Sequence, residues 1–173
     1  MGVEMKTQYV LYYVEGQYEE KLINTLKSEM FTIKTGKVQI LNVVEHQITK
    51  ARLMSIRPGT LVVLVFDTDT GNVNILNKNI EALQNCASVS KIITIPQVRN
   101  LEDELVRSCN IRQIKELLNS KSNSEFKEDI IKVTNLKSKL IEHRFNIGCF
   151  WTANPCAPYQ HIANGAQEVK LRK

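Results

Sequence analysis

The chain has 173 residues, of which 43% are hydrophobic and 24% charged, a composition typical of one soluble globular domain. Its longest apolar run, Leu61 to Phe66, is far shorter than the roughly 20 residues of a membrane-spanning helix, which excludes a membrane span. The first six residues carry no secretory or myristoylation signal, so we expect a cytoplasmic protein. The net charge of +5 lies within residues 91–173, an excess that suits a polyanionic partner such as nucleic acid and equally suits a merely solvated surface.

Strands and helices alternate over the first 100 residues. Apolar runs predict four strands, over 9–14, 38–42, 60–66 and 91–96. Amphipathic spacing predicts the intervening helices, over 17–31, 45–55 and 73–86. The alternation predicts an α/β fold with a mainly parallel four-stranded sheet, and the β-branched run at 60–66 predicts a central strand covered on both faces.

Beyond residue 100 the pattern becomes helical. We expect helices over 101–118 and 126–143, separated by a polar loop at 119–124. Residues 149–173 show no usable period. The whole chain, 1–173, is therefore expected to form a single domain with a helical, basic C-terminal extension at 110–173.

Acidic residues follow two of the predicted strands. Glu15 ends the first, and Asp67 and Asp69 end the third, so a parallel sheet brings all three to one carboxyl edge, where ligands bind. Buried anions without partners are costly, and Mg²⁺ with substrate phosphates is their natural partner. Each motif also has a structural interpretation, because Glu15-Gly16 suits a strand-to-helix turn and 67–72 suits an Asx turn. A haloacid-dehalogenase phosphatase is a further alternative, although that family wants Thr or Val where Gly71 stands.

These motifs resemble the Toprim family of topoisomerases, primases and nucleases. The segment Val14-Glu15-Gly16-Gln17-Tyr18-Glu19 is similar to its first motif, and Val65-Phe66-Asp67-Thr68-Asp69 is similar to its second. The resemblance covers a core at 8–109 and implies the Toprim arrangement of a four-stranded sheet flanked by helices. Since no ATPase, topoisomerase or primase module accompanies the core, the chain most resembles stand-alone or defence-type Toprim nucleases, such as the overcoming-lysogenization-defect nucleases.

The resemblance implies roles for individual residues. Glu15 would be a metal-associated acid or base, and Asp67 and Asp69 would hold Mg²⁺, or Mn²⁺ in its place. Glu19 and Glu102 match acids that the nuclease branch adds, although helix N-termini favour acids in any case. Arg99 is a candidate phosphate contact. Lysines that could approach the scissile phosphate remain open among Lys127, Lys132, Lys137, Lys139 and Lys170.

The leading hypothesis is a Mg²⁺-dependent nuclease that hydrolyses phosphodiester bonds in RNA or DNA, with an anti-phage defence effector as the implied role. The alternative is a non-catalytic module that binds metal and nucleic acid and works with a partner protein. A phosphotransferase or phosphatase acting on small substrates is a third hypothesis. A partner ATPase and a homo-oligomer both remain open.

Overall fold

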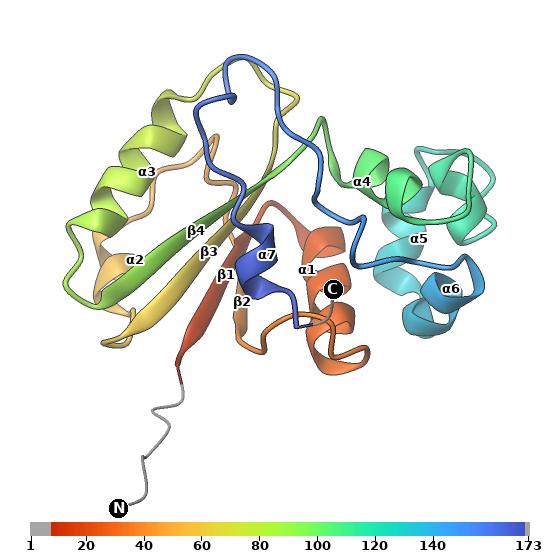
Figure 1. The fold of residues 1–173 in the computed structure, drawn as a ribbon, viewed down its shortest axis with the longest axis horizontal. Coiled ribbons are helices and arrows are strands. Elements are labelled where there is room, and N and C mark those ends of the chain that lie inside the picture. Colours follow the sequence, from red (N-terminus) through yellow and green to blue (C-terminus); the bar gives the residue numbers. More distant parts are fainter. Residues whose placement is uncertain (1–7, 172–173) are drawn as a thin grey trace, which may run out of the picture.

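The computed structural model describes residues 8–171, which fold around a four-stranded parallel sheet (Figure 1). The strands are β1 (Val10–Val14), β2 (Lys37–Ile40), β3 (Thr60–Asp67) and β4 (Val89–Gln97). The helices are α1 (Gln17–Ser28), α2 (Lys50–Met54), α3 (Asn74–Gln84), α4 (Leu101–Ser108), the 3₁₀ helix η1 (Ile114–Leu117), α5 (Phe126–Lys132), α6 (Leu136–Glu142) and α7 (Ala166–Val169). The strand order is β2-β1-β3-β4, and every pair is parallel, which confirms the predicted α/β sheet.

The strand predicted to be central is central. All eight residues of β3 are buried, and β3 lies between β1 and β4. The register pairs Tyr13 of β1 with Leu64 of β3, so Glu15 emerges level with the end of β3, where Asp67 stands. The parallel topology therefore brings the two acidic motifs together, as the sequence pattern predicts.

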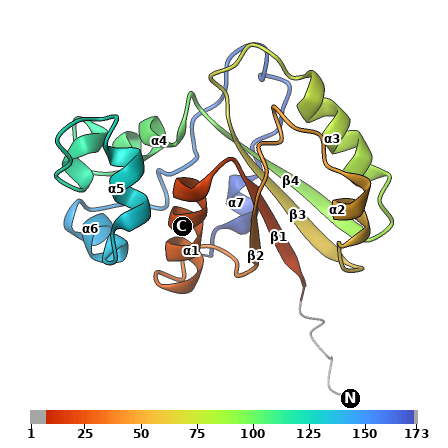
Figure 2. The ribbon, with the colours of Figure 1, turned by 180° about the vertical axis from the view of Figure 1, so that it is seen from behind.

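Helices cover both faces of the sheet. Alternate residues of β1 enter two separate apolar cores, with Tyr12 in one and Tyr13 in the other. The first core contains residues of α1, α4, α5, α6 and α7, and the second contains residues of α3 (Figure 2). Phe126 and Trp151 of the C-terminal extension lie in the first core, so the extension packs into the sheet domain instead of forming a separate body.

The helix expected over 45–55 is shorter than predicted, because only α2 is helical there. The side chain of Asn42 accepts hydrogen bonds from the backbone N–H groups of Val44 and Glu45, which stabilises a turn in place of a helix. The helix begins after Thr49, whose hydroxyl accepts a hydrogen bond from the N–H of Arg52.

The two long helices expected in the extension are also divided. The first helix ends at Ser108, and Cys109 after it has an extended conformation. The carbonyl of Ser108 accepts a hydrogen bond from the N–H of the distant Asn146 in place of a helical partner. The second is interrupted between α5 and α6, where Val133 is extended. Val133 and Thr134 are β-branched and Asn135 favours turns, so all three are weak helix formers.

The C-terminal segment, residues 149–171, for which the sequence shows no pattern, runs along the edge of β4 (Figure 1). The N–H of Gly165 donates to the carbonyl of Thr94 in that strand at 2.8 Å, and α7 follows directly. A single bridge between Ile33 and Lys170 attaches the end of the segment beside α1. Backbone pairing with distant residues therefore orders a segment that has no period of its own.

Within residues 8–171, no helix has both the length and the apolar character needed to cross a bilayer. The signal-free start, argued from residues 1–6, lies outside the described part of the chain.

Candidate metal centre

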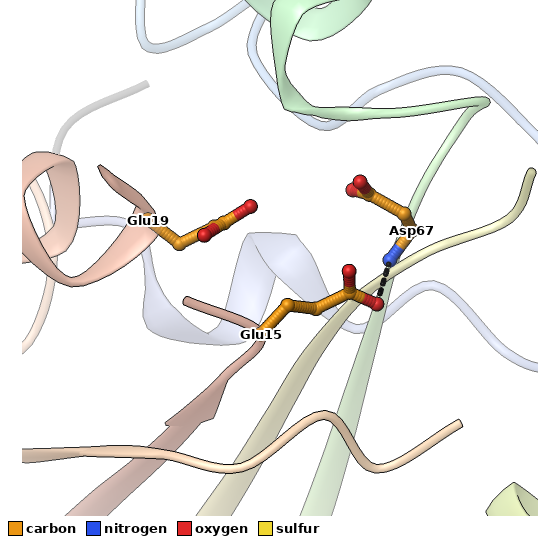
Figure 3. Close-up of side chains that lie close together, drawn as sticks. All are labelled: Glu15, Glu19 and Asp67. Carbon is orange, nitrogen blue, oxygen red and sulfur yellow. Dashed lines mark hydrogen bonds between the residues drawn. The ribbon is translucent and has the colours of Figure 1, made fainter. Parts of the chain in front are cut away.

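Three carboxylates converge at the carboxyl edge of the sheet (Figure 3). Glu15 follows β1, Glu19 lies in the first turn of α1, and Asp67 is the last residue of β3. Each residue contributes one carboxylate oxygen to the cluster, and these three oxygens all lie within 4.8 Å of one another. Adjacent parallel strands and the helix that follows the first of them thus bring two sequence motifs, 52 residues apart, into one cluster.

Glu15 ties the two strand ends together. Its Oε1 accepts a 3.0 Å hydrogen bond from the backbone N–H of Asp67. Burial, together with the nearby charge of Glu19, raises the pKa of Glu15 to about 7, against the lowering effect of this bond. The bond fixes one carboxylate oxygen and leaves the other to face the cluster.

Glu19 is the most unusual member of the cluster. Its side chain is almost fully buried, with 1% of the residue exposed, yet neither carboxylate oxygen has a hydrogen-bond partner among residues 8–171. Burial raises its pKa, and the nearby Tyr18 hydroxyl and the backbone of Glu19 and Gly16 oppose that shift only in part. Gly16 leaves room for this side chain, since a Cβ there would lie 3.2 Å from Glu19 Oε2. An ionised carboxylate in such a position is strongly destabilising unless a cation compensates it.

Asp67 is also buried, with 6% exposed. Burial and the charge of Glu15 raise its pKa to about 9. One hydrogen bond opposes this shift: Gln97 donates from Nε2 to Asp67 Oδ1 at 2.6 Å. Gln97 in turn accepts a 3.1 Å hydrogen bond at Oε1 from Trp151 Nε1. No sequence motif marks this contact, because it joins residues 54 positions apart.

The three carboxylates open into a cavity of about 340 Å³. Its charged lining consists of five acids and one lysine: Glu15, Glu19, Glu45, Asp67, Asp69 and Lys127. Glu45 was not among the predicted site residues, because it was expected to begin a helix. The excess of acids around so small a volume gives a negative site, in which a bound cation would favour ionisation of the three converging carboxylates.

Asp69 lies at the mouth of the cavity. It is exposed and does not join the three converging carboxylates, although its charge contributes to the raised pKa values of Glu15 and Asp67. Thr70, its neighbour, is hydrogen bonded to the hydroxyl of Tyr159 at 2.8 Å, so the C-terminal segment holds this loop. Asp69 therefore adds negative charge to the cavity without joining the three converging carboxylates.

Glu102 lies beside the cavity, in the first turn of α4. Its Oε1 lies 3.1 Å from Lys127 Nζ in an ion pair, while its Oε2 is buried with no hydrogen-bond partner in the described chain. Its charge contributes to the raised pKa of Glu19. Glu104, the neighbouring acid, has a structural role, because its carboxylate accepts bonds from the backbone N–H groups of Val98 and Trp151 and pairs with Arg107.

Arg99 does not line the cavity. Its guanidinium is largely exposed and pairs with Asp103 at 3.2 Å. Its backbone N–H donates to the hydroxyl of Thr68 at 3.0 Å, between the two aspartates of the second motif. Arg99 thus contacts the motif through its backbone, with a left-handed φ of 66°.

Only one of the five lysines left open by the sequence lines the cavity in residues 8–171. This is Lys127 of α5, whose Nζ also lies 5.1 Å from the centre of the Tyr18 ring. Lys132 and Lys139 pair with acids of their own helices, and Lys170 donates to the carbonyl of Phe150. The extension therefore supplies the single cation of the cavity wall.

No family model, curated protein or solved structure matches the chain.

Proposed function

We propose that this chain is a Mg²⁺-dependent nuclease of the Toprim type, which hydrolyses phosphodiester bonds in RNA or DNA. The observation that carries the proposal is the buried Glu19 carboxylate, which has no protein partner in residues 8–171 and meets Glu15 and Asp67 in a cavity beside a lysine. A buried carboxyl group without a partner is either protonated or balanced by a cation, and the two further carboxylates that meet Glu19 in the same cavity favour a cation.

The donor set fits Mg²⁺. All three groups are carboxylates, and the hard cation prefers oxygen ligands at about 2.1 Å. Oxygens that share such an ion lie about 3–4 Å apart, and the three oxygens here lie within 4.8 Å of one another without one. Small side-chain rotations would bring Glu15, Glu19 and Asp67 to bonding distance. Asp69, which lines the cavity, and Glu102, whose Oε2 has no hydrogen-bond partner in residues 8–171, would be the candidate ligands for a second ion.

The bound cation would supply Lewis acidity, which activates a water and stabilises the leaving oxygen of a phosphodiester. The chain itself supplies orientation and proton transfer. Glu15, oriented by the hydrogen bond from the Asp67 N–H, is the candidate for exchanging a proton with the water beside the cation. Lys127 presents an ammonium group to the cavity, where it would contact a phosphate oxygen.

Charge distribution supports a polyanionic substrate. Residues 1–109 carry equal numbers of basic and acidic side chains, so the whole net charge of +5 belongs to residues 110–173. Lys127 comes from this basic extension and reaches the acidic cavity. A nucleic acid strand could contact the extension through its backbone while one phosphate enters the site.

The direct test is incubation of the purified chain with labelled tRNA, ribosomal RNA, single-stranded DNA and plasmid, in Mg²⁺, Mn²⁺ or EDTA. We expect metal-dependent cleavage that Glu19→Gln and Asp67→Asn abolish. Glu20→Gln is the matched control, because Glu20 lies in the same turn of α1 but does not line the cavity. It should cleave like the wild type.

Two outcomes contradict the nuclease. Binding of metal and nucleic acid with no cleavage of any substrate would identify a non-catalytic module that works with a partner. Hydrolysis of small phosphate esters without cleavage of polymers would identify a phosphatase or phosphotransferase on the same edge.

A further inference from the structure

Gln97 is a buried amide that links the acidic cluster to the C-terminal segment. It is the last residue of β4 and is 1% exposed. Its Nε2 donates to Asp67 Oδ1 at 2.6 Å, and its Oε1 accepts from Trp151 Nε1 at 3.1 Å. Both ends of one amide are therefore occupied, and all three hydrogen-bonded side chains are buried.

The chemistry of the indole decides which way this amide faces. Trp151 Nε1–H can only donate, so it requires the oxygen of Gln97 on its side. The opposite orientation would set the amide NH₂ against the indole N–H, leaving two buried donors facing each other. Trp151 therefore obliges Gln97 to present its NH₂ group to Asp67, and that group can only donate to a carboxylate.

Trp151 is itself firmly held. Its ring packs against Phe150, with ring centroids 4.4 Å apart. Its backbone N–H donates to Glu104 Oε2 at 3.2 Å, and its carbonyl accepts from Asn164 Nδ2 at 2.9 Å. The indole thus has a fixed position from which to orient the amide.

We propose that Gln97 and Trp151 are positioning residues of the metal centre, which hold Asp67 by Oδ1 so that its second oxygen stays directed at the cation position. The inference rests on the metal binding proposed above. The bond from Gln97 is the only side-chain hydrogen bond that the structure gives Asp67 in residues 8–171, so it is the polar contact that fixes the orientation of this carboxylate within its buried site. Preorganising a ligand in this way raises affinity, because the entropy of ordering it is lost before the cation binds.

The test measures Mn²⁺ affinity of the full chain by electron paramagnetic resonance, independently of cleavage. Gln97→Met keeps the volume and removes both hydrogen bonds, and Trp151→Phe keeps an aromatic ring and removes the indole donor. We expect each variant to weaken Mn²⁺ binding about tenfold, the low end of losses for such supporting residues. In the double variant, Trp151→Phe should cause no further loss, because it acts only through Gln97.

Tyr12→Phe is the matched control, because it also removes one hydrogen bond of a buried ring, from the Tyr12 hydroxyl to the carbonyl of Lys34, and Tyr12 does not line the cavity. It should lower thermal stability and leave Mn²⁺ affinity unchanged. Wild-type affinity in folded Gln97→Met and Trp151→Phe, or equal losses in Tyr12→Phe, would overturn the positioning role. If Gln97→Met does not fold, Trp151→Phe decides alone. A wild-type chain that binds no Mn²⁺ would instead refute the metal centre itself.

Discussion

The carboxylate of Glu15 accepts a hydrogen bond from the backbone N–H of Asp67, which joins the ends of two neighbouring parallel strands. The bond orients the Glu15 carboxylate and keeps it next to the Asp67 carboxylate, although two ionised carboxylates repel each other. Such an arrangement stores electrostatic strain that a cation can relieve.

The first prediction concerns pH. Glu15 and Asp67 have ordinary pKa values of 4.5 and 3.8, which burial raises to about 7 and about 9. Because the folded chain binds these protons more tightly than the unfolded chain, stability is greatest below pH 4 with respect to these groups and falls as pH rises toward 9. In EDTA, urea unfolding should therefore show a free energy several kcal/mol lower at pH 8 than at pH 5, because over most of this range both groups are ionised in the unfolded chain while Asp67 stays protonated in the folded chain.

The same experiment has an internal control. Asp67→Asn removes one of the titrating groups, so the loss between pH 5 and pH 8 should shrink in that variant. Saturating Mg²⁺ should also reduce the loss, since a ligand that binds only the folded chain stabilises it. A wild-type stability in EDTA that rises over this range would show that the cluster is not strained.

Glu19→Gln should increase the stability of the metal-free chain and abolish metal binding. The substitution replaces a buried, unpartnered carboxylate with a neutral amide of the same size. In EDTA at pH 8 we expect the free energy of unfolding to increase by about 1 kcal/mol, because the cost of burying a charge disappears. Calorimetric titration should show that Mn²⁺ binding is lost. Glu20→Gln, one residue further along α1, should change neither property, and a destabilised Glu19→Gln would contradict the interpretation.

The fold and the central part of the site follow from local sequence pattern. The buried run of β3 and the acid that ends each of two strands suffice to place Glu15 and Asp67 together, because parallel strands share one carboxyl edge. Glu19 follows one turn into α1, a spacing that directs it to the same side. These relationships depend only on strand period, helix period and topology.

The remaining features depend on tertiary contacts that no local pattern encodes. Helix α4 ends at Ser108 because a distant segment bonds its carbonyl, and the Gln97 amide is oriented by Trp151, 54 residues away. The selection of Lys127 among several lysines likewise depends on how α5 packs against α1. Arg99 follows a strand at the correct edge, yet its side chain turns outward to Asp103.

Asp69→Asn should be milder than Asp67→Asn. Asp69 is exposed at the mouth of the cavity, whereas Asp67 is buried within the cluster. We expect Asp69→Asn to weaken Mn²⁺ binding by about tenfold and Asp67→Asn to abolish it, since losing one peripheral ligand costs about 1–2 kcal/mol. Paired titrations at one pH provide the comparison. Equal losses in the two variants would place Asp69 inside the coordination shell.

Lys127→Met should separate cleavage from metal binding. The Lys127 ammonium lines the cavity and pairs with Glu102, but it cannot be a metal ligand while it is protonated, and its pKa is raised by the bond to Glu102. We expect the cleavage rate to fall about 100-fold, the typical cost of losing one charged contact to a reacting phosphate. Mn²⁺ affinity should hold or increase, because the variant removes a positive charge from the site. Lys132→Met, in the same helix but paired only with exposed Glu128, is the control and should cleave normally. Equal rates for the two variants would remove Lys127 from the reaction and leave the acidic cluster as the only reactive part of the cavity.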